Sequence, residues 1–190
     1  MPAERPIKIM LSSTVYHFKN EIEQIYGVLT GFGYEVLCSH TGNLYALGKP
    51  PIGACIQAVE ECDIFLGIIT PFYGSGITHE EILHAIKINK PRIFMNHAHV
   101  TFARQILKPF MYGADKKRND FKIAKSAAMD DIRVVDMYND AIGADKEHLV
   151  EKLWSQEYYN FAKDGMPFIL KQFSDVERVR EDLKKLKDGK

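Results

Sequence analysis

The order of apolar and polar residues in the first part of the chain predicts strands that alternate with helices. Residues 7–11 form a short apolar run of strand length. From Phe18 to Leu29 the apolar residues recur every three or four positions, which is the spacing of a helix with one buried face. Glycines follow that helix and favour its end, and residues 34–38 then resemble a second strand. The pattern so far is strand, helix, strand.

The middle of the chain continues this alternation. Residues 63–69 form the most apolar run, and they lack the alternation of a half-exposed strand, so we expect a strand that is buried on both faces. Pro50 and Pro51 are placed to open a helix before this strand. Another helix is predicted over residues 79–88, and a fourth strand over residues 92–95. Strict alternation of this kind implies a parallel sheet with helices on both faces.

The second half of the chain has a less regular pattern. We predict a helix over residues 102–107, then an exposed polar and basic insertion over residues 113–131. Residues 133–137 are predicted to be a fifth strand, and residues 146–161 a helix. A last helix is expected after the capping box formed by residues 174–177, in which a serine is followed three positions later by a glutamate.

Composition and charge narrow the class of protein. The chain has 190 residues, of which 46% are hydrophobic and 26% charged, as expected for one soluble globular domain. We find no internal repeat and no low-complexity linker, so residues 1–190 are predicted to be a single α/β domain with an open parallel sheet of about five strands. Lys and Arg together number 25, as do Asp and Glu, so no overall basic charge suggests nucleic acid as a partner.

Two further features bear on location. No apolar run approaches the length of about 18 residues that a membrane span requires, so we expect no membrane partner. The three cysteines, Cys38, Cys55 and Cys62, show no paired spacing. A disulfide framework is therefore not expected, and the reducing cytoplasm is the simplest predicted location.

Two loops at the predicted ligand edge of the sheet carry small polar residues. In an open parallel sheet, ligands bind at the carboxyl ends of the strands, and one of these loops follows the first strand while the other follows the third. Hydroxyls, glycines and helix-start N–H groups allow a phosphate or a ribose to approach closely, although the same residues are also common in ordinary turns. The candidate ligand-binding residues are Ser12, Ser13, Thr14, Tyr73, Gly74, Ser75 and Thr78.

Glu81 is the candidate catalytic residue. On a helical wheel Ile82 and Ile86 belong to the core-facing stripe, whereas Glu81 lies at the edge of a second buried surface in the first turn of its helix. A carboxylate beside apolar groups and close to the ligand edge suits chemistry. The alternative is structural, because residues 78–81 read Thr-x-x-Glu, a capping box in which Glu81 would bond back to the N–H of Thr78.

Other candidates for metal and partner binding are weaker. His97 and His99 alternate after the fourth strand, and a metal site together with His79 is conceivable, but ligand-binding or structural histidines fit the pattern better. We therefore predict neither a metal nor a resident cofactor. The basic residues of the insertion are expected to solvate an exposed loop, with phosphate contact as the alternative. Self-association through the apolar stripe of the last helix is a further expectation, unless that stripe packs on its own domain.

Three segments together resemble a known family. They are "IKIMLSSTVYHFKNEI", "GFGYEV" and "CDIFLGIITPFYGSGITHEEILHAIKINKPRIF". They resemble the bacterial domain of unknown function numbered 4062, which is similar in turn to Toll/interleukin-1 receptor (TIR) domains and to nucleoside 2-deoxyribosyltransferases. The resemblance covers about residues 6–110. It implies a TIR-like or transferase-like fold.

The resemblance also implies a chemistry for Glu81. In the transferases a glutamate before a helix and a Gly-Lys-Pro segment attacks the sugar, and Glu81 stands at the matching distance before Lys90-Pro91. In enzymatic TIR domains a glutamate early in the corresponding helix is required to cleave NAD. Both reactions break an N-glycosidic bond, and Ser12 and Ser13 match the loop that approaches the nucleotide in such folds.

The sequence departs from both relatives at specific positions. The transferases carry an aspartate just before the Gly-Thr of this motif, where this chain has residues 73–75, and the tryptophan-cysteine pair of many TIR domains is absent. Two hypotheses therefore stand. The first is a nucleotide-binding enzyme that acts at an N-glycosidic bond of NAD or a nucleotide through Glu81. The second is a non-catalytic module that senses a nucleotide or binds a protein in bacterial signalling or defence.

Overall fold

The computed structural model describes residues 5–14, 17–40, 51–143 and 154–188. Within these residues, five strands form one sheet: β1 (Lys8–Ser13), β2 (Glu35–Leu37), β3 (Ile64–Ile69), β4 (Arg92–His97) and β5 (Trp154–Tyr158). Their order across the sheet is β2-β1-β3-β4-β5, and every neighbouring pair is parallel. The predicted fold class, an open parallel α/β sheet, is confirmed.

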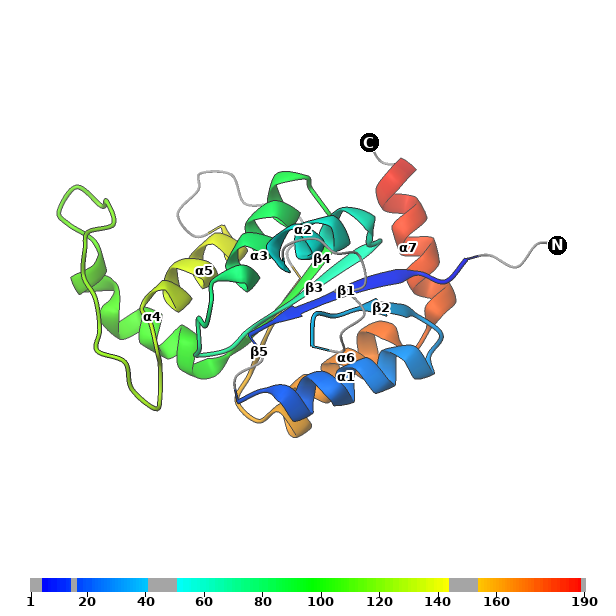
Figure 1. Cartoon of the computed structure of the whole chain (residues 1–190), viewed down its shortest axis with the longest axis horizontal. Coiled ribbons are helices and arrows are strands. Elements are labelled where there is room, and N and C mark those ends of the chain that lie inside the picture. Colours follow the sequence, from blue (N-terminus) through cyan, green and yellow to red (C-terminus); the bar gives the residue numbers. More distant parts are fainter. Residues whose placement is uncertain (1–4, 15–16, 41–50, 144–153, 189–190) are drawn as a thin grey trace.

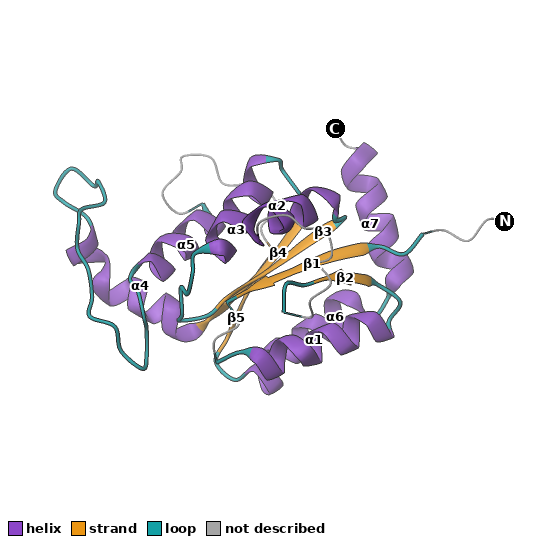
Figure 2. Ribbon diagram, viewed as in Figure 1, coloured by secondary structure: helices purple, strands orange, loops and turns teal. Residues whose placement is uncertain are grey.

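Helices cover both faces of this sheet, as Figures 1 and 2 show. The helices are α1 (Lys19–Gly31), α2 (Pro51–Glu61), α3 (Ile77–Lys87), α4 (Ala98–Met111), α5 (Arg133–Ile142), α6 (Met166–Phe173) and α7 (Val176–Asp188), with a short π-helical turn, η2 (Phe161–Gly165), before α6. Two separate apolar cores result. One lies under α2, α3, α4 and α5, and the other lies under α1, α6 and α7. Both faces of each central strand are therefore buried.

The strand β3 explains why the centre of the sheet is so apolar. All six residues of β3 are buried, as predicted for a strand between two helical layers. Gly67 occupies its middle, and a Cβ at this position would lie 2.9 Å from ring atoms of both Phe65 and Phe94. The absence of a side chain at Gly67 lets these two buried rings pack edge to face on the sheet, with centroids 6.2 Å apart.

The prediction for the fifth strand was wrong. Residues 133–137 begin the helix α5, because the buried residues continue beyond them to Asn139 and Ala141 and the helix ends at Gly143, which has the left-handed φ of 64°. The two adjacent valines suggested a strand only in a short window. The fifth strand is β5, inside the segment predicted as a helix over residues 146–161, so that prediction is also wrong where the structure describes it. Its earlier part, residues 146–153, lies outside the described residues.

The observed starts of α3 and α7 differ from the two capping boxes predicted for them. The helix α3 begins at Ile77 with Gly76 as its N-cap, in the left-handed conformation and without a side-chain cap, so the capping box over residues 78–81 does not form. At the start of α7, a carboxylate oxygen of Asp175 accepts a hydrogen bond from the backbone N–H of Arg178 at 3.0 Å. Asp175, one residue after the predicted Ser174, thus supplies the side-chain cap there.

The last helix covers its own domain. Val179 and Leu183 of α7 are buried in the core beneath α1 and α6, at 8% and 9% exposure. The apolar stripe that sequence analysis offered for self-association is therefore used within the chain. Among the described helices, none combines the length and the apolar character needed to cross a membrane. The predicted insertion, residues 113–131, follows α4 and appears in Figure 1 as the extended segment that projects, beside α4, from the body of the molecule.

Candidate functional site

Glu81 and Ser12 form a buried polar pair between α3 and β1. The hydroxyl of Ser12 donates a hydrogen bond to a carboxylate oxygen of Glu81. Both side chains are closed off from solvent, with exposures of 2% for Ser12 and 3% for Glu81. They meet because Ser12 shares a face of β1 with Met10, the face that α2 and α3 cover. The helical wheel placed Glu81 at the edge of a second buried surface of its helix, and in the structure this side chain is buried.

Cys55 of α2 is the third member of this cluster. Burial raises the pKa of Glu81, while hydrogen bonds from Ser12 and Cys55 act in the opposite direction by favouring the carboxylate. Burial, together with the nearby charge of Glu81, raises the pKa of the Cys55 thiol to about 12. Cys55 is thus a neutral thiol donor, and Glu81 holds its proton more tightly than an exposed glutamate does.

The position of the pair in the sheet is the one where ligands bind in this architecture. The strand β1 has β2 on one side and β3 on the other, so the direction of the chain along the sheet reverses at β1 and β3. Ligands of open α/β sheets bind beside such a reversal, at the carboxyl ends of the strands. Ser12 is the penultimate residue of β1, so the pair lies just behind that edge.

The loop after β3 is held in place by Asp130. Its two carboxylate oxygens accept hydrogen bonds from the backbone N–H groups of Tyr73 at 2.6 Å and of Gly74 at 3.2 Å. Gly74 and Gly76 have φ values of 61° and 84°, a conformation that glycine adopts without strain. Asp130, which sequence analysis placed in an exposed insertion, therefore fixes the glycine-rich loop.

Tyr73 belongs to a chain of polar contacts that also includes His79 and Asp140. His79 Nε2 donates to a carboxylate oxygen of Asp140 at 3.0 Å, which leaves Nδ1 to accept from the hydroxyl of Tyr73, also at 3.0 Å. The guanidinium of Arg133 lies 4.4 Å from the centre of the Tyr73 ring, in a cation–π arrangement. Burial raises the pKa of Tyr73, so its hydroxyl stays protonated.

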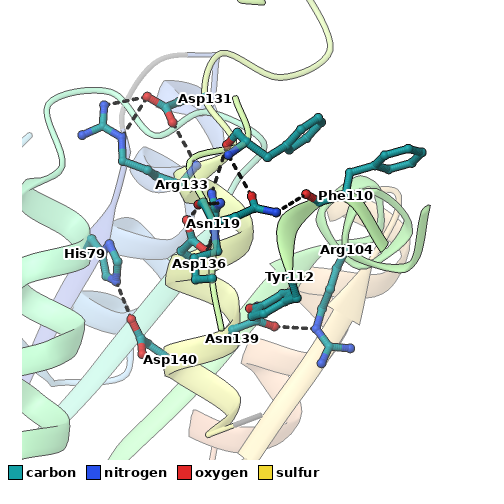
Figure 3. A network of polar contacts seen from close by, with 12 residues as sticks. His79, Arg104, Phe110, Tyr112, Asn119, Asp131, Arg133, Asp136, Asn139 and Asp140 are labelled. Atoms are coloured by element: carbon teal, nitrogen blue, oxygen red, sulfur yellow. Dashed lines mark hydrogen bonds and ion pairs between the residues drawn. The ribbon is translucent and has the colours of Figure 1, made fainter. Parts of the chain in front are cut away.

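Helix α5 links this loop to the projecting segment. Figure 3 shows Asp140 bonded to His79 of α3, and Asn139 accepting a hydrogen bond from Arg104 of α4. Asn139 also donates to the hydroxyl of Tyr112 at 2.9 Å. Asn139 and Asp140 are adjacent in α5. They thus connect α4 to His79, which in turn contacts Tyr73 of the candidate loop.

The remaining predicted site residues are less connected. Ser13 is partly exposed, and the hydroxyl of Thr14 reaches the backbone carbonyl of Tyr73 only at 3.5 Å. Ser75 is exposed, whereas Thr78 is buried inside the first turn of α3. The structure therefore brings Glu81 to Ser12, and Thr14 to the Tyr73 loop, but it does not gather all eight predicted residues around one cavity.

A hollow of about 280 Å³ lies at the same edge of the sheet, and sequence analysis missed it as a site. None of the eight predicted residues lines it. Its walls come from the segments that follow β1, β3, β4 and β5 and are mainly aromatic. The aromatic and imidazole side chains are those of His17, Phe18, Phe72, His97, His99, Tyr158, Tyr159 and Phe161. The available signal was that aromatic residues follow the ends of three different strands.

The polar groups of the described residues include no cluster of three or more His, Cys, Asp or Glu side chains arranged to hold a metal ion. His79 is engaged with Tyr73 and Asp140, while His97 and His99 contact one another with ring centroids 4.5 Å apart. The three histidines considered for a shared metal site thus have separate neighbours.

Asp130→Asn is expected to lower the free energy of unfolding by about 1 kcal/mol, because a charged acceptor for two backbone N–H groups becomes a neutral one. Urea denaturation measures this loss. The matched control is Asp120→Asn, a change at an exposed position of the same insertion, which should cost less than about 0.5 kcal/mol. Equal stabilities of the two variants would show that Asp130 does not hold the loop.

Comparisons with known proteins give a family match and a partial structural likeness. The family model described as "Domain of unknown function (DUF4062)" matches residues 8–186. The match continues well past residue 110, where the resemblance seen in the sequence ended. No match was found among curated proteins. Among solved structures, a 2-deoxyribosyltransferase from Bacillus psychrosaccharolyticus is similar with 20% identity and a TM-score of 0.40, over 47% of this chain and 72% of that chain.

Proposed function

The chain belongs to the family of the domain of unknown function DUF4062, and we propose that it binds a nucleotide or nucleoside and breaks its N-glycosidic bond with Glu81 as the reacting carboxylate. The observation that carries this proposal is the burial of Glu81 against Ser12, just behind the edge where the chain direction reverses between β1 and β3. A carboxyl group in such a place is costly to maintain for structure alone.

The environment of Glu81 suits a reaction at a sugar carbon. When the bond between the base and the sugar breaks, its electron pair leaves with the base, and the sugar carbon becomes oxocarbenium-like. A carboxylate beside this carbon stabilises the positive charge or attacks it, and water or an acceptor base then forms the new bond. In a site with little solvent the attraction between carboxylate and cation is strengthened. Ser12 orients the carboxylate through its hydrogen bond.

One observation favours a second candidate function, a binding module without catalysis. Glu81 is 3% exposed and already bonded to Ser12, and it does not line the hollow at the sheet edge. A glutamate in this state serves to join α3, α2 and β1. The nucleotide would then be sensed at the edge without being broken.

Incubation with NAD and a panel of nucleotides and nucleosides, followed by mass spectrometry, tests the proposal. Wild-type protein is expected to release a free base, and Glu81→Gln is expected to lower the rate at least about 100-fold, the scale of losing a key electrostatic group. The matched control is Glu80→Gln, because Glu80 is the exposed neighbour one position earlier. It should keep full activity. Absence of base release from folded wild type would overturn the enzymatic proposal in favour of the binding module.

A further inference from the structure

The aromatic hollow and the Glu81 cluster lie on opposite faces of the sheet. Three rings of the hollow, those of Phe18, Tyr158 and Phe161, belong to the core beneath α1 and α6. Glu81 packs with α2 and β1 on the face that α2 and α3 cover. What binds in the hollow is therefore a separate question from what reacts at Glu81.

The floor of the hollow is built from rings that pack edge to face. The rings of Phe18 and Phe161 have centroids 5.3 Å apart, and those of Tyr158 and Phe161 are 5.8 Å apart, with interplanar angles near 90°. His97 meets Tyr158 in the same way at 5.3 Å. Such a floor offers ring faces and edges to a flat ligand, and the volume of about 280 Å³ suits a ligand of one or two rings.

Tyr158 lines the hollow, and its hydroxyl is a buried polar group without a partner among the described residues. Tyr158 is 2% exposed, and its oxygen has no hydrogen-bond partner. A buried hydroxyl without a partner costs free energy, so in a native protein such a group calls for a partner such as a bound water, an ion or a ligand. Burial and the negative charge of Glu21 raise the pKa of Tyr158, so the group remains a proton donor.

The charges around the hollow are unfavourable for phosphate. Glu21 is an acid in the lining, and neither lysine nor arginine occurs among the described residues that line it. Burial, with a smaller contribution from the charge of His99, lowers the pKa of His97, so this imidazole is neutral at pH 7. A phosphate would meet repulsion from Glu21 without a compensating cation.

We propose that the hollow is a binding site for a planar heteroaromatic ring that carries an amino group and no phosphate. The ring packs against Phe18, Tyr158 and Phe161, a ring nitrogen or carbonyl accepts the Tyr158 hydroxyl, and the amino group donates to the carboxylate of Glu21. The site does not depend on the proposed reaction at Glu81.

Calorimetric titration tests the site with adenosine and cytidine as probes. Inosine and uridine replace the amino group with a carbonyl oxygen, and the 5′-monophosphates of adenosine and cytidine add only a phosphate. At least one of the two amino nucleosides is expected to bind with a dissociation constant below about 1 mM. Its carbonyl and phosphorylated counterparts should each bind at least about tenfold more weakly, because each loses a hydrogen bond or gains a repulsion.

Variants locate the binding in the hollow. Tyr158→Phe keeps the ring, and Glu21→Gln keeps the shape, so both are expected to fold and to weaken the binding probe at least about fivefold. The control Tyr26→Phe, on the same helix as Glu21, should leave its affinity unchanged. The proposal is overturned if neither nucleoside binds, if the monophosphates bind equally well, or if Tyr158→Phe and Glu21→Gln have no effect.

Discussion

At pH 7 the Glu81→Gln variant is expected to be more stable than the wild type, by about 1–2 kcal/mol. Burial raises the pKa of Glu81 above its ordinary value of 4.5, so the folded state binds the proton more tightly than the unfolded state does. Stability from this group is therefore fully present below about pH 4.5 and is lost as the pH rises through the folded-state pKa. Glutamine keeps the shape and has no charge to bury.

Urea denaturation at pH 4 and pH 7 measures this effect. The difference between Glu81→Gln and wild type should grow from pH 4 to pH 7, while the exposed control Glu80→Gln should show no such growth. A Glu81→Gln protein that is less stable than wild type at both pH values would mean that the carboxylate itself holds the fold together. If the same substitution both removes activity and adds stability, the burial of Glu81 serves the reaction and not the fold.

Gly67→Val is expected to cost about 3 kcal/mol of stability, near the upper end for an overpacked core. The new Cβ alone would lie 2.9 Å from ring atoms of Phe65 and Phe94, which are 0% and 2% exposed and therefore held in the close-packed core. The valine methyl groups would add to this clash. The strand β3 lies in the centre of the sheet, so its displacement would also disturb its pairing with β1 and β4.

Thermal or urea unfolding of Gly67→Val is compared with that of Gly27→Ala. Gly27 lies within α1, and a Cβ there would meet nothing within 4 Å. Because alanine favours a helix over glycine, this control should gain about 0.5–1 kcal/mol. A Gly67→Val protein with wild-type stability would contradict the packing between Phe65 and Phe94.

The first half of the fold could be predicted from the sequence because its patterns are long and unambiguous. The helical spacing of α1 extends over enough residues to exclude a strand, and the apolar run of β3 is too short for a typical helix and rich in isoleucine. The parallel order of strands then follows from the alternation of elements.

The second half could not be predicted because its decisive signals are short or non-local. Val134 and Val135 look like a strand, but the buried positions as far as Ala141 make the segment a helix. The strand β5, with the sequence WSQEY, is polar at most positions and is stabilised by pairing with β4, from which 56 residues separate it (154 − 97 − 1). No local pattern records such a pairing.

The candidate site, like the fold, could be predicted from the sequence only in part. The proximity of Ser12 and Glu81 follows from the rule that ligand-binding groups collect at the carboxyl ends of parallel strands, and sequence analysis named both residues. The role of Asp130 in holding the Tyr73 loop depends on a contact across a sequence separation of 57 residues and has no sequence signature. The aromatic hollow was missed because its walls come mainly from four strand ends, each of which contributes only two or three residues.

The order of the strands has a consequence for the synthesis of the protein. β1, β3 and β4 all lie within residues 8–97, and β3 pairs with both of the others, so this part of the sheet has its partners as soon as residue 97 is available. Tyr158 and Phe161 come later, after the projecting segment and α5. The hollow is therefore completed after the centre of the sheet, and on a ribosome any ligand that occupies it would bind only after Phe161 has been added.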